Sequence, residues 1–167
     1  MQDLKFIVAL SVLVALSGCA NNEPPEKEQT VTPKLTWQEA KAATQATELE
    51  IAGRIPKDQV ASIDQMKDGT LFSCDAGQYD WNGATTVTLK DGIDAESVVK
   101  ALEASYAGSR FQVSADRDVL GDYLVELASS DTGEIYLFSE DDPNTIRIAS
   151  ASACFTLPEG TYPGGEW

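Results

Sequence analysis

The 167-residue sequence contains no histidine. Imidazole is the general base of Ser-His-Asp triads and Cys-His pairs, and it is a frequent ligand of zinc and iron. The chain also has no G-x-S-x-G segment and no glycine-rich phosphate loop after an expected strand. These absences exclude histidine-dependent hydrolysis, histidine-ligated metal centres and glycine-loop nucleotide binding. We expect no catalytic residue, no metal and no cofactor.

Positive charge is scarce in this chain. Lys and Arg together number 12, against 27 Asp and Glu, and the formal net charge is −15. Nucleic-acid binders carry a basic surface that neutralises phosphates, so this composition excludes DNA and RNA as partners. An acidic surface of this kind is typical of a domain that resists self-association. The apolar fraction of 43% is that of a globular protein with a real core.

The apolar run near the N-terminus is too short to span a bilayer. It covers residues 6–16, is broken only by Ser11 and follows a short polar start with Lys5. This pattern is typical of the core of a signal peptide. The segment LSGC at residues 16–19 resembles the bacterial lipobox, in which an aliphatic and two small residues precede an obligatory cysteine. The resemblance implies diacylglyceryl transfer to the Cys19 sulfur and cleavage before Cys19. An ordinary signal peptide with an incidental cysteine is the alternative.

These features divide the chain into three parts. Residues 1–18 are the expected lipoprotein signal peptide. Residues 19–35 form a polar segment with three prolines, a composition typical of a flexible linker, here a tether that starts at the lipid. Residues 36–167 are expected to form one domain. The expected location is the cell membrane, where lipid on Cys19 holds the domain at the extracytoplasmic face. In a bacterium with two membranes, the outer membrane is the alternative.

The residue pattern of the domain predicts an α+β fold with two layers. An antiparallel sheet is expected to carry helices on one face, in the order α-β-β-α-β-β-β-β. Thr36 and Glu39 fit a capping box, so a helix is expected to begin there and to end near Gly53. Asp94 fits the N-cap of a second helix. Strands are expected over 70–74, 84–89, 111–113, 123–127, 135–138 and 146–148.

Two further local structures are expected between these elements. Residues 57–66 are expected to form a short helical turn with Val60 and Ile63 facing inward, because the two apolar residues are spaced as on one helical face. Asn82-Gly83 is expected to belong to the turn of a hairpin, since this dipeptide favours tight turns.

The two other cysteines, Cys74 and Cys154, end one expected strand and follow the last. Export places both in an oxidising compartment, where two thiols in one domain favour a disulfide. Such a bond would close a loop of about 80 residues and contribute roughly 4–5 kcal/mol in the chain-entropy model. The alternative is a catalytic thiol, for which the chain has no histidine to act as a base.

One expected strand suggests a binding surface. If the two aliphatic residues of strand 135–138 face the helices, Tyr136 and Phe138 face the opposite side of the sheet, where Arg147 joins them. Exposed aromatic residues beside a cation are typical of surfaces that bind a partner. The alternative is that the segment 157–167 folds back and covers them.

Acidic residues gather in two expected turns and offer a different chemistry. Asp75 with Asp80, or Glu140 with Asp141 and Asp142, could act as the two acids of a glycosidase or as calcium ligands. Asp is common in turns for backbone reasons, and neither segment has the ligand spacing of a calcium loop. We therefore assign these residues no catalytic or metal-binding role.

The chain resembles small actinobacterial envelope lipoproteins of uncharacterised function. The resemblance rests on the lipobox, the acidic proline-containing tether and the segments FSCDAGQYDWNGATTVTL and SACFTLPEGTYPGG. It implies a location, supports the disulfide and carries over no active site. The expected function is a non-enzymatic binding module that engages an envelope protein or a small ligand. The alternatives are a small carboxylate-dependent hydrolase and a carrier of lipid or another small ligand.

The substitution Cys19→Ala tests lipid anchoring. We expect the variant to leave the membrane fraction and appear in the medium, because it lacks the acyl chains that contribute about 0.8 kcal/mol per buried CH₂. Cell fractionation followed by immunoblotting measures this distribution. Ser17→Ala is the matched control, since it keeps a small residue and leaves Cys19 in place. Unchanged membrane retention of Cys19→Ala would show that lipid on this residue is not the anchor.

Overall fold

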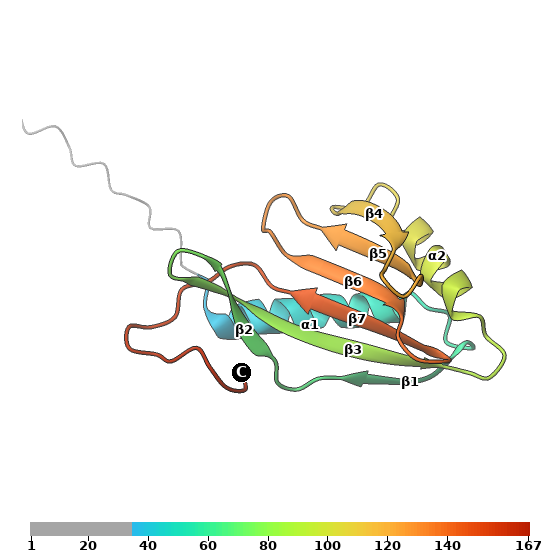
Figure 1. The fold of residues 1–167 in the computed structure, drawn as a ribbon, viewed down its shortest axis with the longest axis horizontal. Helices are drawn as coiled ribbons and strands as arrows, with labels where there is room; N and C mark the ends of the chain where they lie inside the picture. The colour runs from blue at the N-terminus through green and yellow to red at the C-terminus, as the bar shows by residue number, and fades with distance from the viewer. Residues whose placement is uncertain (1–34) are drawn as a thin grey trace, which may run out of the picture. The chain divides into compact units, whose positions relative to one another are not determined.

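The computed structural model describes residues 35–167. The expected signal peptide, Cys19 and the tether as far as residue 34 lie outside the described residues. Within the described part, Figure 1 shows the helices and strands in chain order. They are α1 (Trp37–Gly53), β1 (Val60–Gln65), β2 (Thr70–Asp75), β3 (Gln78–Leu89), α2 (Ala95–Ser105), β4 (Gln112–Arg117), β5 (Tyr123–Ala128), β6 (Ile135–Glu140) and β7 (Thr145–Ala151).

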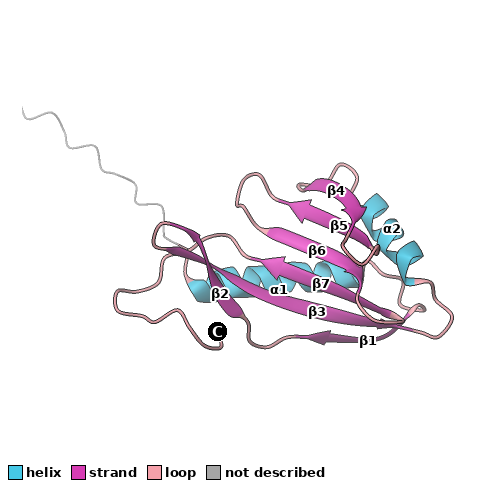
Figure 2. Ribbon diagram, in the orientation of Figure 1, coloured by secondary structure: helices cyan, strands magenta, loops and turns pink. Residues whose placement is uncertain are grey.

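All seven of these strands belong to one antiparallel sheet. Its order is β1-β3-β7-β6-β5-β4. Strand β2 pairs with the first part of β3, at residues 78–82, and β1 pairs with the later part, at residues 85–89. Helix α1 packs on β3 and β7, and α2 packs on β5 and β6. Figure 2 shows α1 passing behind β3 and β7, so the opposite face of the sheet is turned to the viewer. This arrangement confirms the two-layer α+β fold, with one strand more than the sequence pattern predicts.

Both expected helix starts are confirmed. The Thr36 hydroxyl accepts from the Glu39 backbone N–H at 3.2 Å, and the Glu39 carboxylate accepts from the Thr36 N–H at 2.9 Å. These two bonds form the capping box of α1. At α2, the Asp94 carboxylate accepts from the Ser97 N–H at 2.9 Å. Local chemistry alone fixes where each helix begins.

The expected helical turn at residues 57–66 is wrong, because this segment is strand β1. Val60 lies opposite Leu89 and Gln65 opposite Thr85, with a register shift near Val60. Ile63 is 44% exposed instead of facing inward. β-Branched residues favour strands, and the edge of β3 offers a ladder of backbone partners that a short isolated turn would lack.

The expected turn at Asn82-Gly83 is also wrong. Strand β3 runs straight through this dipeptide, and the β2–β3 turn lies earlier, where Gly77 has φ 72°. Gly83 is needed for a different reason. A Cβ at this position would overlap the indole of Trp81, which is fully buried. Glycine therefore serves close packing here instead of a tight turn.

The core consists of two clusters of buried residues: one lies beneath the helices, and the other lies at one end of the sheet. The larger one fills the space between the two helices and the sheet, and includes Val87, Val125, Ile146 and Ile148. The second one surrounds Trp81 and includes Leu35, the last residue expected in the tether. The other residues of this second cluster are Trp37, Ala40, Leu71, Tyr79, Phe155, Leu157 and Trp167.

Trp167 is held on the second cluster by its backbone and its ring. Gly69 and Trp167 exchange two backbone hydrogen bonds of 2.9 and 3.1 Å. The Trp167 oxygen also accepts from the Trp81 indole at 3.1 Å and from the Lys41 ammonium at 2.9 Å. Its ring meets that of Trp37 edge-on, with 5.2 Å between centroids. The segment after β7 is thus fastened beside the start of α1.

The expected disulfide between Cys74 and Cys154 is confirmed. It links β2 to the segment after β7 across a sequence separation of 80 residues, with a Cα–Cα distance of 6.3 Å. A cross-link over a loop of this length contributes roughly 4–5 kcal/mol in the chain-entropy model. It closes the same end of the domain as the Trp81 cluster.

Glu48 lies on the sheet-facing side of α1 and is fully buried. Its carboxylate accepts from Thr85 on β3 at 2.7 Å, from Ser150 on β7 at 2.5 Å and from Gln65 on β1 at 2.9 Å. A buried carboxylate is costly unless its oxygen atoms are hydrogen-bonded. These three bonds therefore fix the position of α1 against three strands.

The substitution Glu48→Ala tests this constraint. We expect it to lower the free energy of unfolding by roughly 2–4 kcal/mol, because two hydroxyls and one amide lose their buried acceptor. Urea unfolding followed by circular dichroism at neutral pH measures the loss. Glu48→Gln is the matched control, since its oxygen still accepts from Thr85 and Gln65 while its amide donates to Ser150. We expect this control to lie within about 1 kcal/mol of wild type. Equal losses in both variants would contradict a role for the acceptor geometry.

Candidate functional site

Tyr136 and Phe138 do not form an exposed surface, so that prediction is wrong. Both are fully buried on the helix side of β6, where Tyr136 lies opposite Leu127 and Phe138 opposite Val125. The Tyr136 ring also meets Phe111 edge-on at 5.7 Å. The large rings fill the space beneath the helices, and the aliphatic residues of β6 take the other face. The residues of β6 alternate between the two faces as expected, but the face predicted to be exposed is the buried one.

Arg147 lies on the other face of the sheet, apart from the two aromatic residues. It is exposed on β7, opposite Thr86 of β3 and Ser139 of β6. The segment 157–167 does not cover Tyr136 or Phe138, because it packs on the Trp81 cluster instead. The three residues of the expected binding surface are therefore not brought together.

Two of the acidic side chains considered above, Asp75 and Asp80, make local hydrogen bonds, and Asp80 lies in β3 and not in a turn. The Asp75 carboxylate accepts from the Ala76 N–H at 2.7 Å, and Asp80 accepts from the Asn82 amide at 2.6 Å. In the β6–β7 turn, Asp142 bonds to Thr145 through its backbone N–H. Among residues 35–167, no three His, Cys, Asp or Glu side chains gather as a metal site.

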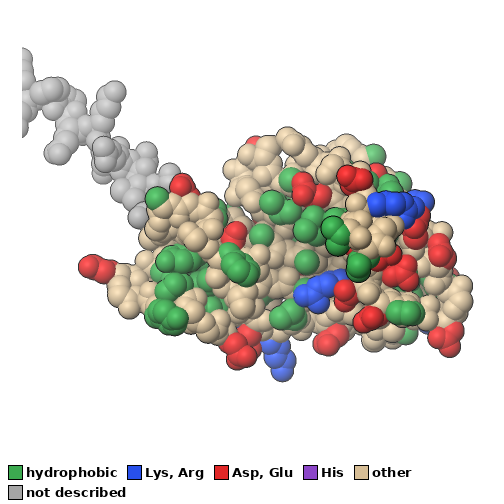
Figure 3. All heavy atoms as spheres, viewed as in Figure 1, with side chains coloured by type: hydrophobic (Ala, Val, Ile, Leu, Met, Phe, Trp, Pro, Cys, Tyr) green, Lys and Arg blue, Asp and Glu red, His purple; other side chains and the backbone are tan. Residues whose placement is uncertain are grey.

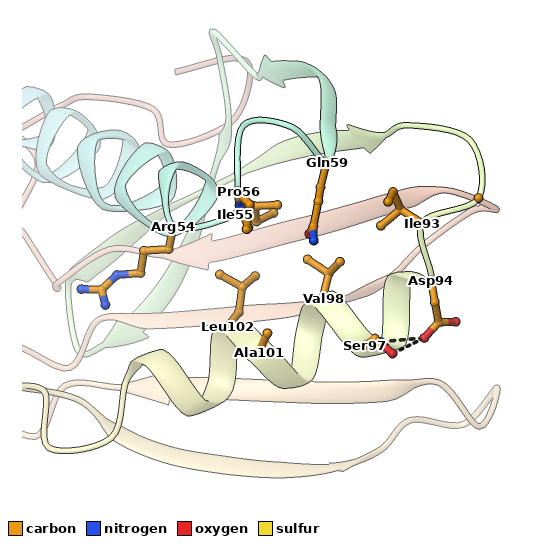
Figure 4. Close-up of a pocket in the computed structure, with 11 residues that line it drawn as sticks. Arg54, Ile55, Pro56, Gln59, Ile93, Asp94, Ser97, Val98, Ala101 and Leu102 are labelled. Atoms are coloured by element: carbon orange, nitrogen blue, oxygen red, sulfur yellow. Dashed lines mark hydrogen bonds between the residues drawn. The ribbon is translucent and has the colours of Figure 1, made fainter.

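A cleft between the two helices is the best candidate site. It has a volume of about 350 Å³ and lies between the C-terminal end of α1 and the N-terminal half of α2. Figure 4 shows its lining residues on facing elements, with Arg54 at one end and Asp94 at the other. The floor is apolar and buried, and is formed by Ile55, Val98 and Leu102. The remaining lining residues are Pro56, Gln59, Gly92, Ile93, Ser97 and Ala101.

Arg54 supplies a fixed positive charge at its end of the cleft. One guanidinium nitrogen donates to the Ser105 carbonyl at 3.0 Å, and another pairs with Glu50 at 2.9 Å. The group also lies over the Tyr106 ring, 4.1 Å from its centroid. The hydrogen bond to Glu50 raises the pKa of Arg54, so the guanidinium stays charged. These contacts hold the cation in place without using all of its donors.

Asp94 supplies a negative charge at the opposite end. The Ser97 hydroxyl and backbone N–H both donate to its carboxylate, and these bonds lower the pKa of Asp94. The cleft is thus an apolar slot with a cation at one end and an anion at the other. Such a slot can bind an apolar group and orient it by charge.

The sequence pattern contained one signal for this cleft. Ile93 and Val98 are spaced as a hydrophobic staple at the start of α2, and Ile93 does pack on the core. Ile55 and Pro56, which follow α1, could be seen as an apolar pair just after a helix end. Their approach to α2 depends on how the two helices sit on the sheet, which no local pattern reveals.

Comparison with known proteins finds no matching family model, no matching curated protein and no matching solved structure. Among the residues that the structure describes, no helix is both long and apolar enough to cross a membrane.

Burial of Tyr136 predicts a loss of stability at alkaline pH. Burial raises the pKa of its phenol to about 12, above the value of about 10 in an unfolded chain. Because this pKa is raised in the folded state, the contribution of the neutral Tyr136 phenol to the free energy of unfolding is complete below about pH 10. It is lost as the pH rises towards about 12. We expect Tyr136→Phe to lose less stability over this range than wild type, by on the order of 2 kcal/mol.

Urea unfolding at about pH 9 and about pH 11.5 measures this difference. Tyr162→Phe is the matched control, because Tyr162 is 80% exposed. This variant should lose as much stability between the two pH values as wild type does. A Tyr136→Phe variant that loses as much stability as wild type would show that this phenol is not the titrating group.

Proposed function

We propose that the chain is a membrane-anchored extracytoplasmic lipoprotein whose domain is a non-enzymatic binding module. The lipobox-like segment with Cys19 supports the anchor, and the disulfide of the domain agrees with an oxidising compartment. The cleft between α1 and α2 is the observation that carries the proposed binding. Its partner in the envelope is a small ligand or an apolar group of another protein.

The cleft favours a small amphiphile with an anionic end. An apolar body fits against Ile55, Val98 and Leu102. Its anionic end reaches outward to the Arg54 guanidinium, which Figure 4 shows directed away from these apolar residues. A volume of about 350 Å³ lies near the lower end of the roughly 300–1,000 Å³ found for small-molecule sites. This size gives less support to a carrier of multi-chain lipid. The local hydrogen bonds of the Asp75 and Asp80 carboxylates give less support to a hydrolase that uses this pair.

The fluorescent probe 8-anilinonaphthalene-1-sulfonate tests this proposal, because it joins an apolar ring system to a sulfonate. We expect the mature chain, residues 19–167 with Cys19→Ala, to bind the probe at one saturable site. Ala101 is exposed on α2 at the wall of the cleft, and Ala101→Trp should fill the slot and weaken binding at least about tenfold. Arg54→Met should weaken it several-fold, since the cation is lost and the apolar stem is kept.

Ala46→Trp is the matched control for the bulky substitution. Ala46 is an exposed alanine of α1 and does not line the cleft, so this variant should bind as wild type does. Undiminished binding to Ala101→Trp, or an equal loss in Ala46→Trp, would show that the probe binds elsewhere. Absence of saturable binding to the unmodified cleft would contradict the proposal.

A further inference from the structure

Strand β4 is an edge strand of the sheet. Within residues 35–167 it pairs with β5 alone, and all six of its residues are exposed. Its register with β5 is uninterrupted from Gln112 to Arg117, whereas β1 and β2 each contain a register shift. Natural edge strands are protected by bulges, prolines, charged side chains or short length. Strand β4 has no bulge and no proline, and its charged residues, Asp116 and Arg117, lie at one end.

The β4–β5 hairpin shows which backbone groups of β4 face outward. The Asp118 N–H donates to the Asp122 carbonyl at 3.0 Å, so the backbone of Asp118 faces β5. Backbone pairs alternate along an antiparallel ladder. The N–H groups of Val113, Ala115 and Arg117 therefore face away from β5.

Side chains cap the two ends of this outward edge. The Arg117 N–H donates to the Asp116 carboxylate at 2.7 Å, and the Phe111 N–H donates to the Ser109 hydroxyl at 3.2 Å. Between these capped ends, the N–H groups of Val113 and Ala115 remain directed outward. The open part of the edge is thus short and has defined ends.

A groove lies beside the same open part. It has a volume of about 350 Å³ and is lined by Val113 of β4 and by Glu103, Ala104 and Ala107 at the C-terminal end of α2. Directly opposite residues of paired strands place their side chains on one face of the sheet. A residue added opposite Val113 would therefore direct its side chain into this groove. The open backbone groups and the groove coincide at Val113.

The charge around this edge favours a basic occupant. Glu103 lines the groove, and Asp116 and Glu126 lie on the other face of β4 and β5. The two arginines that flank β4 already pair with carboxylates, Arg110 with Glu134 and Arg117 with Glu96. Figure 3 shows the face of the sheet opposite the groove, where acidic side chains also predominate. A second copy would itself carry a net charge of −15 over the whole chain, which opposes self-pairing.

We propose that β4 binds an extended basic peptide segment of a partner as an additional strand. The peptide backbone pairs with Val113 and Ala115, and the stem of a Lys or Arg lies in the groove against Ala104 and Ala107, with its charge near Glu103. Main-chain bonds supply affinity and the acidic groove supplies selectivity. This edge is separate from the cleft beside Arg54, so the inference stands whether or not the cleft binds a ligand.

Amide hydrogen exchange with a defined peptide tests the proposal. The probe is acetyl-Lys-Val-Lys-Val-Lys-Val-amide, added to the mature chain, residues 19–167 with Cys19→Ala, and followed by NMR. We expect binding with a Kd below about 1 mM, and exchange at Val113 and Ala115 slowed at least about tenfold. The Ser114 amide already faces β5 and should change little. The same peptide with Asp in place of Lys should not bind.

Two variants locate the binding on the edge and in the groove. Ala115→Pro removes an outward N–H and leaves the β4–β5 ladder intact, because proline is tolerated where the N–H faces solvent. It should weaken peptide binding at least about fivefold, whereas Ala115→Val, which keeps the N–H, should bind as wild type does. Ala107→Trp should fill the groove and weaken binding without changing the edge backbone, with Ala46→Trp as its control.

Several results would overturn this inference. They are the absence of binding by the basic peptide, binding that leaves Val113 and Ala115 unprotected, and equal binding of the acidic peptide. Protection of these two amides by self-association, detected by sedimentation without peptide, would assign the edge to a second copy instead. If Ala115→Pro fails to fold, the exchange pattern and Ala107→Trp still decide the outcome.

Discussion

Glu48 lies on α1, and its carboxylate accepts hydrogen bonds from residues of three strands, β1, β3 and β7. The placement of α1 on the sheet, and with it the rest of the fold, depends on this contact. Further along β3 and β7 the buried residues are apolar, such as the facing pair Val87 and Ile146. If α1 shifted by one turn along the sheet, the carboxylate would lie among those residues without its donors, at a cost of several kcal/mol. The polar contact therefore specifies one position of the helix, where apolar packing alone would tolerate several.

The fixed position of α1 determines what lies at each of its ends. At the N-terminal end, Trp37 and Lys41 meet Trp167, and the disulfide closes the nearby strands. At the C-terminal end, Ile55 and Pro56 approach α2 and leave the cleft between them. One end of the layer is cross-linked and filled with aromatic rings, while the other is open and lined with fixed charges. The end with the disulfide and the Trp81 cluster holds α1 in place, and this fixes the position of the residues that line the cleft.

Local chemistry made much of the fold predictable, and long-range packing explains the rest. The capping box at Thr36 and the N-cap at Asp94 depend on residues within three positions, so they could be inferred directly. The disulfide followed from the count of cysteines and the expectation of an oxidising compartment. By contrast, all four residues of 135–138 are apolar, so alternation did not reveal which face is buried; that depends on pairing with β5 and β7.

The other errors have the same origin. Asn82-Gly83 carries a strong turn signal, but Gly83 is required by the ring of Trp81, a contact that becomes apparent only in the folded sheet. The segment at Val60 satisfies a helical spacing, and only the free edge of β3 makes it a strand. The cleft needs the ends of two helices that are far apart in the sequence. None of these features could be deduced from neighbours along the chain.

The length of α1 separates two features of the domain. Trp37, which contacts Trp167, begins the helix, and Arg54, which lines the cleft, follows its last residue. The helix has 17 residues and is therefore about 25 Å long. The cleft beside Arg54 is therefore separated by about one helix length from the residue at which the described chain enters α1.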